Sequence, residues 1–216
     1  MALNEARGNM YEFVTHTFNT TKGACPYNCA YCYMHKYWSI KHPYFAEKEL
    51  ETDLGSGKSI FVGSSIDMFA DNIPDEWIDR TIHHLEKFDN EYFLQTKNPR
   101  RLSQFDLLKI RCVVGTTIET NRYYREFMGK TPTPQDRAKH MPKGHSVTIE
   151  PIMDFDVVEF LALIKSCEPQ YVNIGADSGN NGLPEPSKEK VLNLIKGLKS
   201  FTSVHLKKNL NRILGA

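Results

Sequence analysis

Three cysteines lie within eight residues of the chain, at positions Cys25, Cys29 and Cys32. Thiolates this close together can face one metal centre from a single loop, and soft sulfur ligands select zinc, copper(I) or an iron–sulfur cluster. A four-iron cluster normally takes four cysteines, so a set of three leaves one iron open for another ligand. The spacing C-x3-C-x-Tyr-C, with Tyr31 before the last cysteine, therefore predicts an iron–sulfur site with one open coordination position.

Two other interpretations of these cysteines stay open at this point. Together with His35 they make a Cys3His set, which is a ligand set of closed structural zinc sites. A disulfide is disfavoured, because the chain has an odd number of cysteines, five, and residues 1–11 lack the pattern of a signal peptide. We therefore expect a cytoplasmic, reducing environment. Cys112 and Cys167 are distant from the motif and are expected to be small buried hydrophobic residues.

Length and composition predict a single domain over residues 1–216. Hydrophobic residues make up 40% of the chain and charged residues 25%, which are ordinary globular values. The net charge of +1 gives no global signal for nucleic acid or an anionic membrane. No apolar run approaches the ~18 residues that span a bilayer, so no membrane partner is expected. The composition does not indicate an oligomeric state.

Short β-branched or aromatic runs alternate with longer amphipathic stretches after the cysteine motif. Alternation of this kind predicts right-handed crossovers and a parallel sheet. The chain is short for an eight-fold barrel of about 250 residues, so an α/β fold with a partial, open (β/α)6 barrel fits better, with an open doubly wound sheet as the alternative. We expect strands at 15–21, 58–62, 91–95, 111–117, 146–150, 170–175 and 203–206, and helices at 74–88, 99–108, 122–128, 133–140, 157–167 and 187–200.

Polar residues follow several of these strands, at the end where each strand finishes. In parallel α/β folds, ligands bind at the carboxyl ends of the strands. A site of cofactor size is therefore expected where these residues converge. The candidate cofactor-binding residues from these strand ends are Gly63, Ser64, Ser65, Asp67, Lys97, Thr117, Glu119 and Glu150, and the cysteine loop follows the first expected strand to the same edge.

The chain resembles the radical S-adenosylmethionine (radical SAM) superfamily over nearly its whole length, from about Gly8 to Leu210. Within that superfamily it looks most like a phage- and prokaryote-associated family related to spore photoproduct lyase. It is shorter than spore photoproduct lyase, and no counterpart of that enzyme's hydrogen-donor cysteine is found. The stretches that carry the resemblance are residues 8–11, 25–34, 61–69, 95–99, 150–151, 175–179 and 206–208.

The resemblance implies a fold and a set of cofactor ligands. It implies a radical-SAM-type partial TIM-like barrel with a 4Fe-4S cluster on the three cysteines of the motif, and S-adenosylmethionine (SAM) on the open iron. Tyr31 would pack on the adenine, and residues 63–65 would contact the methionyl amine. Lys97 would pair with the methionyl carboxylate, while Thr117 and Glu119 would reach the ribose hydroxyls.

The implied reaction is reductive cleavage of SAM to methionine and a 5′-deoxyadenosyl radical, which takes a hydrogen atom from a substrate. A low-potential electron donor of the flavodoxin or ferredoxin type is implied as a partner. A nucleotide or nucleic-acid substrate is a hypothesis from two basic segments with interleaved aromatic residues. They contain Arg122, Arg125, Lys130, Arg137, Lys139 and Lys143 in one case and Lys97, Arg100 and Arg101 in the other. A solvated helix face with tyrosines in the core explains the same pattern.

Two further function classes stay open. A zinc-stabilised α/β module that binds a nucleic acid or a protein would do no chemistry. A cluster with bound SAM can also serve non-radical chemistry, and no residue of the sequence excludes this.

Overall fold

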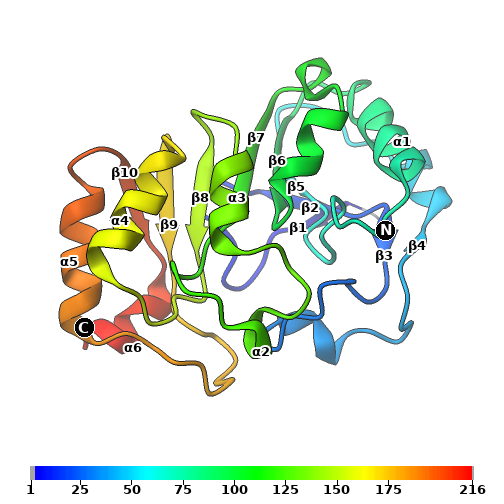
Figure 1. Ribbon diagram of the computed structural model, residues 1–216. Coiled ribbons are helices and arrows are strands. Elements are labelled where there is room, and N and C mark those ends of the chain that lie inside the picture. Colours follow the sequence, from blue (N-terminus) through cyan, green and yellow to red (C-terminus); the bar gives the residue numbers. More distant parts are fainter. Residues whose placement is uncertain (1–2, 216) are drawn as a thin grey trace. The chain divides into compact units, whose positions relative to one another are not determined.

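The computed structural model describes residues 3–215 and shows an α/β fold with a mostly parallel β-sheet (Figure 1). These residues form two compact units. The first contains the residues up to Asn28 together with Cys32–Val114, and the second contains Cys29–Tyr31 and the residues from Gly115 onward. The sequence predicted a single domain over residues 1–216. Whether the two units combine into one domain stays a prediction. Between residues 3 and 215, no helix is long and apolar enough to cross a membrane.

The first unit contains four neighbouring strands in the order β1-β2-β5-β6, which are Leu3–Glu5, His16–Phe18, Ser59–Val62 and Glu91–Thr96. Strand β1 runs antiparallel to β2, and the other pairs are parallel. Strands β3 (Thr21–Lys22) and β4 (Tyr44–Phe45) form a separate antiparallel pair. The helices are α1 (Asp75–Leu85) and the 3-10 turns η1 (Tyr33–Lys36), η2 (Glu47–Glu51), η3 (Pro99–Gln104) and η4 (Leu107–Lys109).

The second unit contains the end of β7 (Cys112–Thr117), followed in the sheet by β8 (Ser146–Ile149), β9 (Tyr171–Ile174) and β10 (Ser203–Leu206), all parallel. Helices α4 (Val157–Ser166) and α5 (Lys188–Leu198) lie side by side (Figure 1). A Cβ atom at Gly197 would lie 2.5 Å from Leu161, so glycine permits this close packing. The shorter helices are α2 (Arg125–Met128), α3 (Pro134–His140), η5 (Lys208–Leu210) and α6 (Asn211–Leu214).

The strand registers place the predicted site residues. In the first unit Phe18, Val62 and Leu94 are aligned at the carboxyl ends of β2, β5 and β6. In the second unit Ile149, Ile174 and Leu206 are aligned in the same way. The polar residues that follow these positions therefore emerge together at one edge of each unit's sheet.

Most expected elements are confirmed, and their local signals explain them. Helix α1 buries Ile78, Ile82 and Leu85, which recur at helical spacing. Helix α5 begins after Ser187, whose side chain accepts a hydrogen bond of 3.3 Å from the Lys190 amide, as an N-cap residue does.

Two expected helices are wrong in part. Residues 99–108 form 3-10 turns rather than one helix. Here the buried Arg101 side chain donates to the carbonyls of Ala70 and Ile73, so tertiary contacts decide the local conformation. In the 122–128 segment only α2 is helical, because the Arg122 amide bonds to the Thr120 hydroxyl at 3.0 Å and holds the chain in a turn. The antiparallel strand β1 was not predicted.

Candidate cofactor site

The cysteine motif forms an irregular loop. Asn28 has φ of +51°, and its amide donates to the Cys25 carbonyl at 3.2 Å, which closes a turn between the first two cysteines. Cys29 is buried, Cys25 and Cys32 are half-buried, and all five cysteines are thiols. Cys29–Tyr31 belongs to the second compact unit, whereas Cys25 and Cys32 belong to the first. The loop thus contributes residues to both units.

Three hydrogen bonds hold the middle of this loop in the second unit. The Cys29 thiol donates to the Met128 carbonyl at 3.3 Å, and the Ala30 amide donates to the Phe127 carbonyl at 2.8 Å. The Tyr31 hydroxyl donates to Oε1 of Glu119. Because a metal-bound thiolate has no proton to donate, the Cys29 contact belongs to the cluster-free protein, while the other two contacts are compatible with a bound cluster.

Glu119 follows the carboxyl end of β7 and is fully buried together with Arg137 of α3. Arg137 Nη1 donates to Glu119 Oε2 at 2.7 Å. The guanidinium uses all its donor groups inside the protein. Its other acceptors are the carbonyls of Pro132 and Thr117, each at 2.8 Å, the Thr131 hydroxyl at 2.7 Å and the Met128 sulfur at 3.9 Å. Sequence analysis missed this buried role, because it grouped Arg137 with the exposed cations.

Burial and charge together decide the protonation states of Tyr31 and Arg137, the two hydrogen-bond partners of Glu119. Burial raises the pKa of Tyr31 well above its ordinary value, and the negative charge of Glu119 raises it further, so Tyr31 is a neutral hydrogen-bond donor. Burial is the largest single influence on Arg137 and lowers its pKa, but the charge and hydrogen bond of Glu119, together with Tyr31 and Cys29, outweigh it, so the pKa of the guanidinium is raised. Glu119 therefore accepts one hydrogen bond from a neutral phenol and one from a cation. Both of its oxygens are used before any cofactor is considered.

The loop after β5 contains predicted cofactor-binding residues of the first unit, Gly63, Ser64 and Ser65. Gly63 has φ of +78°, a conformation that favours glycine, and its amide donates to the Phe18 carbonyl at 3.0 Å. Asn19, at the end of β2, accepts from the Ser65 amide at 3.1 Å and donates to the Ser64 hydroxyl at 3.1 Å. The Tyr33 hydroxyl donates to the Ser64 carbonyl at 2.9 Å. Asn19 is a positioning residue that sequence analysis did not identify.

Asp67 connects this loop to the end of β6. Its carboxylate accepts from the Lys97 amide at 2.7 Å, the Thr96 hydroxyl at 3.1 Å and the Phe69 amide at 3.0 Å. Burial raises the pKa of Asp67, and these hydrogen bonds act in the opposite direction. Asp67 thus holds two strand-end segments together, and its role as a cofactor-binding residue stays a prediction.

Ser65 has the feature expected of a cofactor-binding residue. Its Oγ atom is buried and has no hydrogen-bond partner among residues 3–215. Leaving a buried hydroxyl unpaired is unfavourable, so its neighbourhood favours a ligand with a polar group. The half-buried Lys97 directly follows the next strand, and its cation is suited to a carboxylate; the contacts of Ser65 and Lys97 with SAM stay predictions.

A third polar group lies at the ends of β8, β9 and β10. Lys207 Nζ pairs with Glu150 Oε2 at 2.7 Å, and Asn209 Nδ2 donates to Glu150 Oε1 at 2.9 Å. A Cβ atom at Gly175 would lie 2.6 Å from Glu150 Oε1, so only glycine leaves room for this carboxylate. Glu150 is thus placed at the predicted strand edge, and Lys207 and Asn209 are its partners.

The donor set determines which metal centre fits. Among the described residues, no group of three or more His, Cys, Asp or Glu side chains could hold a single metal ion. A four-iron cluster places each cysteine sulfur on a different iron, so its three thiols do not need to converge on one point. The sulfur-only chemistry of the motif, with three thiols on one loop, fits the cluster. The assignment of the three cysteines as its ligands stays a prediction.

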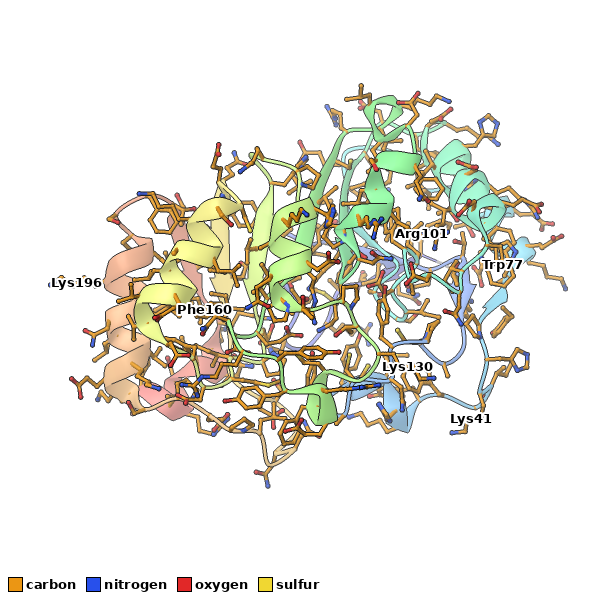
Figure 2. All side chains as sticks on the ribbon, viewed as in Figure 1. Lys41, Trp77, Arg101, Lys130, Phe160 and Lys196 are labelled. Atoms are coloured by element: carbon orange, nitrogen blue, oxygen red, sulfur yellow. The ribbon has the colours of Figure 1, made fainter. Side chains whose placement is uncertain are left out.

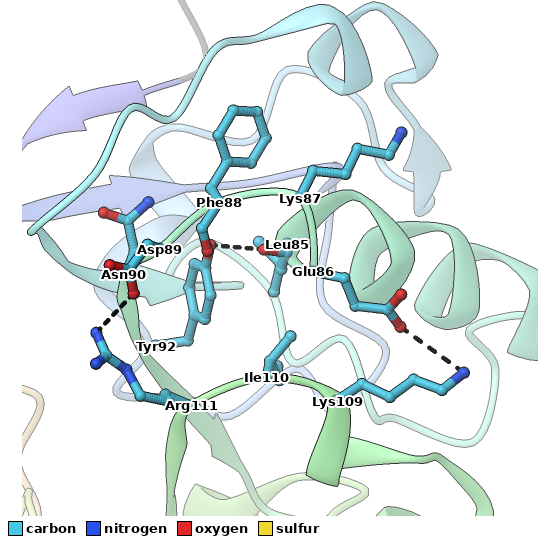
Figure 3. Close-up of a pocket in the computed structure, with 10 residues that line it drawn as sticks. All are labelled: Leu85, Glu86, Lys87, Phe88, Asp89, Asn90, Tyr92, Lys109, Ile110 and Arg111. Carbon is cyan, nitrogen blue, oxygen red and sulfur yellow. Dashed lines mark hydrogen bonds and ion pairs between the residues drawn. The ribbon is translucent and has the colours of Figure 1, made fainter.

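A shallow depression of about 400 Å³ in the first unit lies away from these residues (Figure 3). It is lined by residues at the amino ends of β6 and β7 and the end of α1, which is the opposite edge of the sheet from Gly63 and Lys97. Its charged residues pair with one another, Arg111 with Asp89 at 3.2 Å and Lys109 with Glu86 at 3.8 Å (Figure 3). This depression is therefore not the candidate cofactor site.

Comparisons with known proteins identify the fold. No protein-family model matches the sequence, and no curated protein matches it. The structure is similar to a double mutant of spore photoproduct lyase with bound AdoMet and dinucleoside spore photoproduct, with a TM-score of 0.66 and 10% identity, covering 94% of this chain and 80% of that one. A single mutant of the same enzyme gives a TM-score of 0.67 and 12% identity, covering 92% and 78%.

These likenesses define the class of fold. The chain has a mostly parallel α/β fold of the type found in radical SAM enzymes, as the strand–helix alternation and the resemblance predicted, and a partial barrel is consistent with it. The particular protein whose fold it shares is spore photoproduct lyase.

Proposed function

We propose that this protein is a radical SAM enzyme. The observation that carries the proposal is the hydrogen bond from Tyr31, inside the cysteine motif, to Glu119, just beyond the carboxyl end of β7. This contact joins the middle of the motif to a strand end, and ligands of parallel α/β folds bind at such ends, which supports the proposal. The same fold in spore photoproduct lyase has been seen with bound AdoMet.

In this proposal Cys25, Cys29 and Cys32 hold a 4Fe-4S cluster, with SAM on the open iron. When bound, the cluster would supply the electron for reductive cleavage of SAM to methionine and a 5′-deoxyadenosyl radical, which would take a hydrogen atom from the substrate. The protein binds and orients SAM and excludes water from it. The Ser65 hydroxyl accepts from the methionyl amine, and Lys97 pairs with the carboxylate.

The glutamates act from the second unit. Glu119 keeps Tyr31 and the cysteine loop in place, because both of its oxygens already accept hydrogen bonds from the protein. Contact between Glu119 and the ribose hydroxyls therefore requires one of these bonds to be shared, and Thr117 is the second candidate for that contact. Glu150 pairs with Lys207 within this unit, and its role as a cofactor-binding residue is part of the proposal.

The proposed partners are a low-potential electron donor of the flavodoxin or ferredoxin type and a nucleotide or nucleic-acid substrate. The substrate proposal is supported by the dinucleoside bound to spore photoproduct lyase and by exposed cations of this chain, which include Arg125, Lys130 and Lys139 (Lys130 is labelled in Figure 2). Arg137 and Arg101 do not contribute to such a surface, because both are buried. Five cysteines present as thiols suit a reducing cytoplasm.

Cluster assembly tests the proposal. Anaerobically reconstituted protein is expected to contain about four irons with a brown absorbance, and Cys29→Ala is expected to lose it. Cys112→Ala is the matched control, because Cys112 lies at the start of β7 and burial raises its thiol pKa to about 11. One zinc per chain and no iron would instead support a zinc-stabilised binding module without catalysis.

A further inference from the structure

Residues 33–42, immediately after the last cysteine of the motif, expose aromatic side chains to an unusual degree. Tyr33 is 58% exposed, Tyr37 62% and Ile40 38%. Large apolar side chains that are exposed singly are common, but three within eight residues form a patch. The patch belongs to the first compact unit, so it can be described without reference to the second.

The same segment is positively charged and has no acidic residue to neutralise it. It contains Lys36 and Lys41, both exposed, and the sequence has no Asp or Glu at residues 13–46. Figure 2 shows Lys41 projecting away from the ribbon. A negatively charged partner is therefore favoured.

Local contacts hold these side chains in place. The Tyr33 hydroxyl is tied to the Ser64 carbonyl at 2.9 Å although its ring is exposed. Lys36 Nζ lies 5.1 Å from the centre of the Tyr37 ring, so a cation lies directly beside an exposed aromatic face. His35 and Trp38 have ring centres 4.7 Å apart. Rings held in this way lose little conformational entropy when a ligand stacks on them.

We propose that residues 33–42 bind single-stranded nucleic acid, with bases stacking on Tyr37 and Tyr33 and phosphates contacting Lys36 and Lys41. This inference rests on the proposed function in one respect: it names the substrate class of the proposed enzyme. The segment directly follows Cys32, the last cysteine of the motif. Aromatic faces combined with cations are the recognition chemistry of single strands, whose bases are open for stacking. In a duplex the base faces are covered by neighbouring base pairs, so the tyrosines would have nothing to stack on.

An acidic protein, such as an electron donor, is the competing occupant. Charge attracts both partners equally, so the aromatic rings decide between them. Two exposed tyrosines with lysines interleaved match base stacking combined with phosphate contacts.

Binding of a labelled oligothymidine of about twelve nucleotides, measured by fluorescence anisotropy on the reconstituted full chain without SAM or reductant, tests the proposal. We expect affinity that falls steeply between about 50 and 200 mM salt. Tyr37→Ala should weaken binding about 5- to 100-fold. Tyr37→Phe, which keeps the ring, should bind like the unmodified protein. The double variant Lys36→Gln with Lys41→Gln should bind more weakly and with a smaller salt dependence.

Three outcomes would overturn the proposal: no binding at low salt, equal binding by Tyr37→Ala and Tyr37→Phe, or tighter binding of the matching duplex. If Tyr37→Ala weakens docking of ferredoxin or flavodoxin but not of the oligonucleotide, the surface serves the electron donor instead. The iron content and circular dichroism of each variant show whether it is folded. Because this binding needs no radical chemistry, its failure is distinguishable from failure of SAM cleavage, which Tyr37→Ala should leave unchanged.

Discussion

Arg137 Nη1 and Glu119 Oε2 are 2.7 Å apart, and neither side chain is exposed to solvent. Glu119 also accepts the hydrogen bond of Tyr31, so this ion pair supports the central segment of the cysteine loop. A buried pair of this kind stabilises little relative to apolar packing, but removal of one partner leaves an uncompensated buried charge.

Arg137→Met is therefore expected to lower the free energy of unfolding by about 3–5 kcal/mol, because Glu119 loses its counter-ion. Urea unfolding of the cluster-free protein measures the change. The double variant Arg137→Met with Glu119→Leu should recover much of the loss. Arg212→Met is the control, because Arg212 pairs with Glu185 at the surface, where a pair contributes about 1 kcal/mol or less. Equal effects at the two arginines would contradict this account.

His84 is expected to make stability depend on pH. Its Nε2 bonds to the Thr52 carbonyl at 3.1 Å, while its buried Nδ1 has no partner among residues 3–215. Burial lowers the pKa of His84, so the folded state binds a proton less readily than the unfolded state, whose histidine has a pKa of about 6.5. The stabilising contribution is thus present above that pH and declines as the pH falls through it towards the folded pKa.

Chemical unfolding at pH 7.5 and pH 5 checks this expectation. His84→Gln should reduce the difference in stability between the two pH values. His83→Gln should leave the difference unchanged, because the His83 side chain is 73% exposed. A pH dependence identical in the two variants would show that another group is responsible.

Several elements could be predicted from sequence because their signals are local. The alternation of strands and helices, the Ser187 N-cap and the strand-end polar residues each depend on neighbouring positions in the chain. Residues 99–108 could not be predicted, because the conformation depends on Arg101 reaching carbonyls about 30 residues earlier. A basic residue in sequence gives no indication that it will be buried.

The candidate site was also predictable only where the signals are local in the sequence. The cysteines and Gly63 are identified by spacing and by type. The pairing of Arg137 with Glu119, and of Lys207 with Glu150, joins residues far apart in the chain and is visible only in the structure. Asn19 also escaped notice, because a single asparagine after a strand resembles an ordinary turn residue.

Ser65→Ala is expected to weaken SAM binding without lowering the stability of the fold. Because the Ser65 hydroxyl has no partner among the described residues, its removal should leave the free energy of unfolding unchanged or slightly higher. Loss of a hydrogen bond to the charged amine should weaken SAM binding to the reconstituted protein roughly 10- to 100-fold. Calorimetric titration and urea unfolding measure the two effects. Ser64→Ala, which removes a bond to Asn19, should instead lower stability.

The most direct measurement of the central claim is the formation of 5′-deoxyadenosine. Anaerobically reconstituted protein is reduced with dithionite and given SAM, and the nucleoside is assayed by chromatography beside Cys29→Ala and Cys112→Ala. The account predicts the nucleoside from the unmodified protein and from Cys112→Ala, and none from Cys29→Ala. Protein that binds iron and SAM but yields no 5′-deoxyadenosine would contradict radical chemistry and favour a non-radical use of the bound SAM.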